Sequence, residues 1–151
     1  MLPYNSLIPL ASWTGPRFAL NRGMAKNGGS LRVLVVEDDV PIGRMLASIL
    51  ADEGYVVDLA SDGLTALGKI EVREYDLILT DLRMPELDGV GLYRELERRQ
   101  PEMLRRVIVI TGTSGHPEYE SFLEETKVPY LEKPFSLQAL QAITRRVLAA
   151  A

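Results

Sequence analysis

Short apolar runs alternate with amphipathic stretches along most of the chain, from about residue 31 to residue 149. Runs with the length and β-branched content of strands occupy residues 31–36, 55–60, 75–80, 107–111 and 129–132. After each run, apolar residues recur at helical spacing, which predicts helices over about 41–53, 62–73, 88–100, 117–126 and 136–149. The helical residues expected to face the core include Ile42, Met45, Leu46, Ile49, Leu50, Leu64, Leu67, Ile70, Leu137, Leu140, Ile143 and Val147.

Five strand–helix pairs in strict alternation predict an α/β fold in which helices cover both faces of a parallel sheet. The first, third and fourth runs are apolar throughout, as central strands are, whereas the second carries Asp58 and suits an edge. This favours a doubly wound five-stranded sheet of order 2-1-3-4-5, in which the winding reverses between the first and third strands. The length of the chain agrees with one domain, which we assign to residues 30–151.

Composition narrows the class of protein. Hydrophobic residues make up 46% of the chain and charged residues 25%, as in ordinary globular domains. No apolar run approaches the ~20 residues of a membrane span, so we expect no membrane contact and a cytoplasmic location. The lack of cysteine excludes disulfides and thiolate chemistry, and a single histidine excludes a metal site built from several histidines.

Charge is distributed unevenly along the chain. Residues 1–30 contain three basic and no acidic residues, whereas the remainder contains 14 basic and 21 acidic residues. An acidic body repels phosphate backbones, so no nucleic-acid partner is expected. Residues 1–29 lack a helical or strand period and are predicted to be a flexible N-terminal arm. Two alternatives stay open: a start codon assigned too early, with Met24 as the working start, and an arm that docks through Trp13 and Phe18.

Polar residues follow the predicted strands at the sheet edge where folds of this kind bind ligands. Three acids come after the first strand, one follows the third, a hydroxyl ends the fourth and a lysine follows the fifth. These residues are Glu37, Asp38, Asp39, Asp81, Thr111 and Lys133. An aspartate after a strand is more often a helix cap or turn residue, so their joint position at four strand ends carries the argument.

Carboxylates gathered at one edge repel one another unless a cation lies among them. Oxygen ligands of this kind suit Mg²⁺, while the charge of Lys133 and the hydroxyl of Thr111 suit a bound anion. The combination predicts phosphoryl chemistry with a carboxylate nucleophile. Asp81 is the natural nucleophile because it lies on a central strand, between the acidic residues and the lysine.

Four segments, "VLVVEDD", "ILTDLRMPELDG", "VIVITG" and "YLEKPF", resemble the response-regulator receiver domain of two-component signalling. The similarity covers about residues 31–149 and keeps both order and spacing. It implies the flavodoxin-like receiver fold, and phosphorylation of Asp81 by a histidine kinase or a histidine phosphotransfer protein. It also implies that Glu37, Asp38, Asp81 and the backbone carbonyl of Arg83 hold Mg²⁺. The bond between Lys133 and the proline after it would be cis.

The same resemblance implies a conformational switch. Thr111 and Lys133 match the phosphate-sensing pair of the family, and Tyr130 matches its switch aromatic. The surface of the fourth helix, fifth strand and fifth helix would then change and signal to a downstream protein or a second copy of the chain. Arg83 and Thr113, each two residues beyond a site residue, are expected to tune the lifetime of the phosphoryl group.

Two other classes of protein fit the sequence less well. An aspartyl phosphohydrolase of the haloacid-dehalogenase type needs a second aspartate where this chain has Arg83, so we expect a phospho-acceptor limited to self-phosphorylation and self-dephosphorylation. A dinucleotide-binding enzyme needs a glycine-rich turn where the chain has "EDDVPIG". His116 is expected to be a surface turn residue. A free-standing regulator is expected, with a C-terminal receiver fragment of a hybrid histidine kinase as the alternative.

Overall fold

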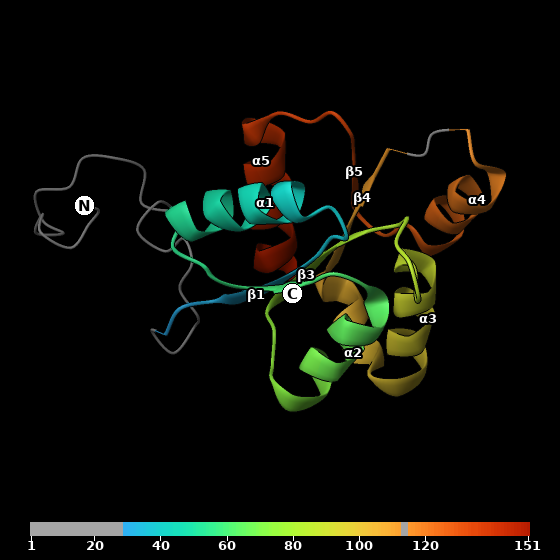
Figure 1. The fold of residues 1–151 in the computed structure, drawn as a ribbon, viewed down its shortest axis with the longest axis horizontal. Coiled ribbons are helices and arrows are strands. Elements are labelled where there is room, and N and C mark those ends of the chain that lie inside the picture. Colours follow the sequence, from blue (N-terminus) through green and yellow to red (C-terminus); the bar gives the residue numbers. More distant parts are fainter. Residues whose placement is uncertain (1–28, 113–114) are drawn as a thin grey trace, which may run out of the picture.

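The computed structural model describes residues 29–112 and 115–151, in which a central sheet lies between two layers of helices (Figure 1). The strands are β1 (Arg32–Val36), β2 (Val56–Ala60), β3 (Leu77–Asp81), β4 (Val107–Thr111) and β5 (Tyr130–Glu132). They run parallel in the order β2-β1-β3-β4-β5. The predicted fold class and strand order are therefore confirmed, with β2 at an edge.

The helices begin and end close to their predicted bounds. They are α1 (Val40–Asp52), α2 (Gly63–Val72), α3 (Gly89–Arg99), α4 (Pro117–Thr126) and α5 (Leu137–Ala150). Asp39, Asp62, Asp88 and Ser136 cap four of them, because each side chain accepts a hydrogen bond from a backbone N–H in the first turn. A 3-10 helix, η3 (Pro101–Arg106), follows α3 where the sequence predicted only a stop at the proline.

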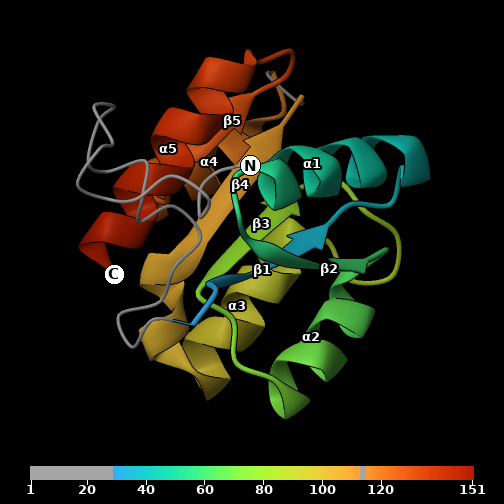
Figure 2. The same ribbon diagram turned by 90° about the vertical axis from the view of Figure 1, so that its left-hand side faces the viewer.

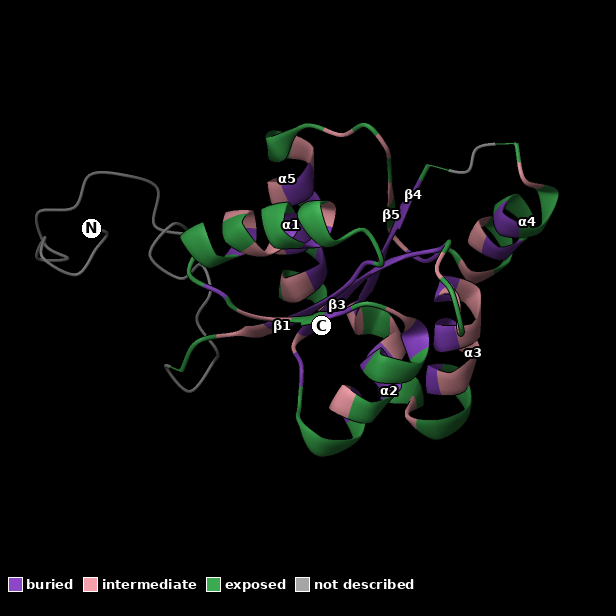
Figure 3. Ribbon diagram, in the orientation of Figure 1, coloured by how far each residue is buried: buried purple, intermediate pink, exposed green. Residues whose placement is uncertain are grey.

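Each face of the sheet has its own apolar core, because successive side chains of a strand point to opposite faces. Strand residues Val33, Val35, Leu77, Leu79, Ile108 and Ile110 pack with α1 and α5 on one face. Residues Leu34, Val36, Ile78, Val107 and Val109 pack with α2, α3 and α4 on the other. Figure 2 shows the two helical layers from the side, and Figure 3 shows that burial concentrates in the central strands.

Three helical residues predicted to face the core lie at the surface. Met45, Leu64 and Leu137 are 50%, 55% and 46% exposed, respectively. A helix lying on a sheet buries only the middle of its apolar stripe, so residues at the margin of that stripe remain in solvent. The remaining apolar residues of the three stripes are buried or partly buried against one of the two cores.

Asp58 on the edge strand β2 is held by three neighbours. It accepts a hydrogen bond of 2.7 Å from the hydroxyl of Tyr75, and it forms ion pairs with Arg73 at 3.2 Å and Arg32 at 3.6 Å. Partial burial opposes ionisation of this carboxyl, but the hydrogen bonds and positive charges lower its pKa below the ordinary value. This cluster joins the edge strand to the first residue of β1 and to the segment that precedes β3.

Two expectations from the sequence fall outside the described part of the chain. Residues 1–28, which make up almost all of the predicted N-terminal arm, are not described, and neither is Thr113. Within the described residues, none of the helices combines the length and the apolar character needed to span a membrane.

Candidate functional site

The register of the sheet brings the polar strand ends to one edge. Val36 of β1 pairs with Thr80 of β3, so the residues after them, Glu37 and Asp81, lie at the same level. Asp81 in turn pairs with Ile110 of β4, which places Thr111 one step beyond it. Thr111 pairs with Glu132 of β5 and accepts a backbone hydrogen bond of 2.8 Å from the N–H of Lys133. The predicted site residues are therefore neighbours at the carboxyl edge.

Three carboxylates gather at this edge. One oxygen from each of Glu37, Asp38 and Asp81 lies within 4.8 Å of the others. Glu37 and Asp81 are only 5% and 7% exposed, whereas Asp38 is open to solvent. Asp39 turns away and caps α1 through a hydrogen bond of 3.1 Å from the N–H of Ile42. Of the three acids after β1, two face the site and the third starts a helix.

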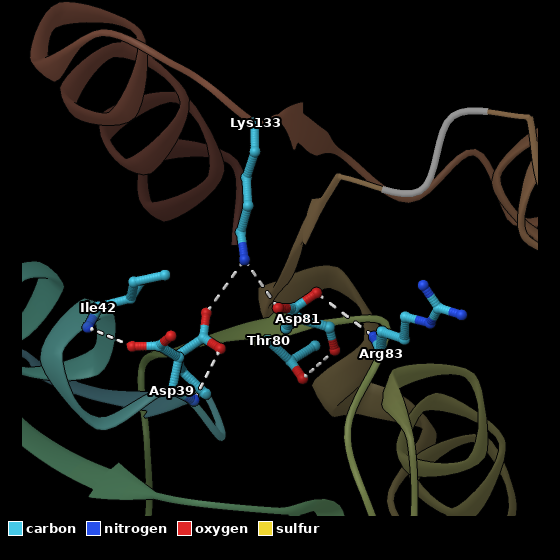
Figure 4. A network of polar contacts seen from close by, with 7 residues as sticks. Asp39, Ile42, Thr80, Asp81, Arg83 and Lys133 are labelled. Carbon is cyan, nitrogen blue, oxygen red and sulfur yellow. Dashed lines mark hydrogen bonds and ion pairs between the residues drawn. The ribbon is translucent and has the colours of Figure 1, made fainter.

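Lys133 reaches across the edge to the two buried acids (Figure 4). Its Nζ lies 2.9 Å from Oδ2 of Asp81 and 3.4 Å from Oε1 of Glu37. Burial would lower the pKa of Lys133, but the hydrogen bond that it donates to Asp81 and the two negative charges raise it, so the ammonium stays charged. The Lys133–Pro134 peptide bond is cis, as predicted.

The environment of Glu37 disfavours a second negative charge beside Asp81. Burial is the main cause that raises the pKa of Glu37 to about 7, and the charge of Asp81 adds to the shift. A hydrogen bond of 3.2 Å from the N–H of Asp39 and the charge of Lys133 act in the opposite direction. A single lysine does not fully compensate these acids, and carboxylate oxygens are the ligands that Mg²⁺ prefers. The donor set therefore fits a hard divalent cation.

The loop after Asp81 is fixed to the carboxylate and at both of its ends. The N–H of Arg83 lies 3.3 Å from Oδ1 of Asp81. At one end, the N–H of Gly89 donates to the carbonyl of Leu82 at 2.8 Å; at the other, the N–H of Gly63 donates to the carbonyl of Leu87 at 2.9 Å.

Only glycine fits at these two positions, because the backbone of another segment lies too close to leave room for a Cβ atom. A Cβ atom on Gly89 would lie 2.3 Å from the carbonyl oxygen of Asp81, and one on Gly63 would lie 2.4 Å from that of Leu87. This requirement was not predicted from the sequence. Its signal is an Asp–Gly pair at the start of two helices, at residues 62–63 and 88–89.

The two predicted switch residues lie on neighbouring strands. Thr111 is buried, with 4% of its surface exposed, at the end of β4. Tyr130 is 44% exposed at the start of β5, where it pairs with Val109. His116 occupies the cap position of α4 without capping it through its side chain, and its ring packs 5.6 Å from that of Tyr119. A link between Tyr119 and Asp88 was not predicted from the sequence.

Comparison with known proteins assigns this arrangement to a family. Residues 33–145 match the family described as the response regulator receiver domain. The chain is 33% identical to the transcriptional regulatory protein ZraR of Klebsiella oxytoca over 123 residues, which cover 82% of this chain and 27% of that protein. It is 35% identical to the response regulator MprA of Mycobacterium tuberculosis strain H37Rv over 119 residues, 79% of this chain and 51% of that protein.

A solved structure shows the same similarity in three dimensions. The receiver domain of the sensor histidine kinase PA1611 from Pseudomonas aeruginosa, which has a magnesium ion in its active site cleft, aligns with a TM-score of 0.71. It is 32% identical and covers 79% of this chain and 98% of that domain. The chain spans about half or less of the length of the two curated relatives above.

Proposed function

The chain belongs to the response regulator receiver family, and on that premise we propose that Asp81 accepts a phosphoryl group from a phosphohistidine. The donor would be a histidine kinase or a histidine phosphotransfer protein. The observation that carries the proposal is the position of Asp81, which is 7% exposed at the edge of the sheet and 2.9 Å from the ammonium of Lys133. A carboxylate kept for solubility or helix capping needs no such neighbour.

The chemistry needs no general base, because Asp81 attacks as a carboxylate. One carboxylate oxygen forms a bond to phosphorus while the phosphorus–nitrogen bond of the donor breaks. The electron pair of that bond returns to the imidazole nitrogen, and the product is an acyl phosphate on Asp81. Lys133 and the hydroxyl of Thr111 would then face the phosphoryl oxygens, with the lysine supplying a fixed positive charge.

We propose that Glu37, Asp38, Asp81 and the backbone carbonyl of Arg83 hold Mg²⁺ at this site. The ion, when bound, neutralises the acidic cluster and the phosphoryl oxygens during transfer. The carboxylates supply the hard oxygen ligands it prefers. The hydrogen bond from the N–H of Arg83 to Asp81 keeps the backbone of this residue beside the acids.

Phosphorylation would change the surface formed by α4, β5 and α5, and a partner would bind to that surface. Thr111 would turn towards the phosphoryl group, and Tyr130 would move into the space beside β4. The partner of that face would be a downstream protein or a second copy of the chain. The excess of acidic residues after residue 30 favours a protein partner over a nucleic acid. The domain would signal in this way, and the only reactions of its own would be self-phosphorylation and self-dephosphorylation.

The test is transfer from a small phosphodonor such as acetyl phosphate, followed by intact-mass measurement. Wild type should gain one phosphoryl group when Mg²⁺ is present and none when a chelator removes it. Asp81→Asn should gain none in either condition. Asp39→Asn is the matched control, because Asp39 caps α1 instead of facing the site and asparagine caps equally well. Equal labelling of the Asp81→Asn variant would show that another residue is the acceptor.

A further inference from the structure

Helices α3 and α4 contact each other at three successive levels. Farthest from the site, Arg94 forms an ion pair of 3.1 Å with Glu125. In the middle, the rings of Tyr93 and Phe122 meet edge to face at 5.1 Å between centroids. Nearest the site, the hydroxyl of Tyr119 lies 3.4 Å from Oδ2 of Asp88. The first two contacts join helix to helix, whereas the third joins α4 to the end of the loop that follows Asp81.

The two oxygens of Asp88 have separate partners. Oδ1 accepts a hydrogen bond of 2.8 Å from the N–H of Gly91 and so caps α3, which leaves Oδ2 to the hydroxyl of Tyr119. Tyr119 is 9% exposed, and its pKa is raised by burial and by the charge of Asp88. The hydroxyl therefore keeps its proton and donates.

Tyr119 lies in the turn of α4 on which the switch would act. Between Thr111, the last residue of β4, and Pro117, the first residue of α4, there are only five residues. On the proposed function, a movement of Thr111 towards Asp81 would be passed along this short connection to the first turn of the helix. The hydrogen bond to Asp88 anchors that same turn to the opposite loop.

We propose that the Tyr119–Asp88 hydrogen bond is a latch that holds the first turn of α4 in place while Asp81 is a free carboxylate. The inference rests on the proposed function of Asp81, and it makes Tyr119 a positioning residue that acts through Asp88 and the 82–88 loop. Phosphorylation works against the latch, because the pull of Thr111 on α4 must overcome it. The strength of the latch then determines how far phosphorylation shifts the conformation of the face formed by α4, β5 and α5.

Linkage gives the direction and size of the expected effect. An interaction made only in the resting arrangement opposes every ligand that favours the activated one. At 3.4 Å this hydrogen bond is longer than the about 2.5–3.0 Å that is usual between two oxygens, so its free energy lies at the low end of the usual range. Its loss should therefore tighten the binding of a phosphoryl analogue by roughly 2- to 3-fold. It should also loosen the first turn of α4 before any analogue is added.

The experiment compares wild type with Tyr119→Phe and Asp88→Ser. Phenylalanine keeps the ring and loses the donor, while serine still caps α3 but is too short to reach Tyr119. Tyr93→Phe is the matched control, because it removes a hydroxyl from the same helix pair and leaves the Asp88 contact intact. Amide hydrogen exchange over residues 115–127 is measured in Mg²⁺ buffer, first without beryllium fluoride and then across a titration with it.

The latch predicts faster exchange at the start of α4 and roughly 2- to 3-fold tighter analogue binding in both test variants. Tyr93→Phe should behave as wild type, and the double variant should add nothing to either single change. Exchange and affinity equal to wild type in Tyr119→Phe, or weaker binding, would overturn the latch. If wild type itself does not bind the analogue, the proposed function fails, and exchange without analogue still decides whether the contact holds the helix.

Discussion

The substitution Gly89→Ala tests how tightly the backbone around Asp81 is packed. The added Cβ would lie 2.3 Å from the carbonyl oxygen of Asp81 and 2.8 Å from Cα of Leu82. Ordinary carbon–oxygen contacts are about 3.3–3.6 Å, so the backbone on one side must retreat by roughly 1 Å. Both obstructing atoms belong to the main chain, which cannot rotate away as a side chain would.

Overpacking of this kind costs about 1–3 kcal/mol of unfolding free energy. Each kcal/mol lowers the thermal midpoint of a domain near 100 residues by about 4–8 °C. The same displacement moves Asp81 relative to the N–H of Arg83, so phosphorylation of the folded variant should also slow. Denaturant unfolding gives the first quantity, and intact-mass labelling at a temperature where both proteins are folded gives the second.

Gly68→Ala is the matched control, because it makes the same chemical change in a helix. An added Cβ at this exposed position of α2 meets no atom within 4 Å. Alanine is favoured over glycine inside a helix by about 1 kcal/mol, so this variant should be more stable and label normally. If Gly89→Ala unfolds and labels as wild type does, or if Gly68→Ala is the less stable of the two, the packing argument is wrong.

Three further predictions concern the switch, the lifetime and acid stability. Thr111→Ala should still be labelled at Asp81 but should lose the change in amide exchange over 117–135 that wild type shows on phosphorylation; a wild-type response in the variant contradicts the coupling. Exchanging Arg83, at the mouth of the site, should alter the rate at which labelled protein loses its phosphoryl group, and identical decay across several substitutions would end that idea. The lowered pKa of Asp58 means that its contribution to stability is present above the unfolded value, near 3.8, and is lost as pH falls through the folded value. The gap in thermal midpoint between wild type and Asp58→Asn should therefore shrink below about pH 4, and a constant gap from pH 7 to pH 2 would exclude this linkage.

The order of the strands was predictable because burial leaves a direct trace in the sequence. β1, β3 and β4 are apolar apart from Arg32 at the start of β1 and polar residues at the ends of β3 and β4, as strands covered on both faces are. Asp58 marked the edge strand, and it has the charged neighbours that a partly buried carboxylate needs. The positions of Glu37 and Asp81 then followed from the parallel register.

Helical periodicity predicted the burial of individual residues less well. It shows which side of a helix a side chain points to, but not whether another element covers that side. Met45 and Leu64 have core spacing, yet they lie at the margin of their apolar stripes and are half exposed. η3 was missed because a proline after a helix signals a stop equally well whether a tight turn or a loop follows.

The partners in contacts between separate segments could not be identified from local spacing in the sequence. The role of Gly89 depends on a carbonyl eight residues earlier, and that of Tyr119 on a carboxylate 31 residues earlier. The second partner of Lys133 also could not be predicted from the motifs, because Glu37 lies 96 residues away in the chain. Such pairings arise from the close approach of loops at one edge, which local spacing does not encode.

The separation of the two edges of the sheet makes this chain convenient for fluorescence labelling. The proposed phosphorylation and metal-binding residues lie at the carboxyl edge, whereas the exposed Glu74 lies before β3 at the amino edge. Glu124 is exposed on α4, and the whole sequence contains no cysteine. Glu74→Cys and Glu124→Cys together would carry the only two thiols, so a donor and an acceptor dye could be attached without removing any native group. Energy transfer between them would then report the position of α4 against the body of the fold, one molecule at a time.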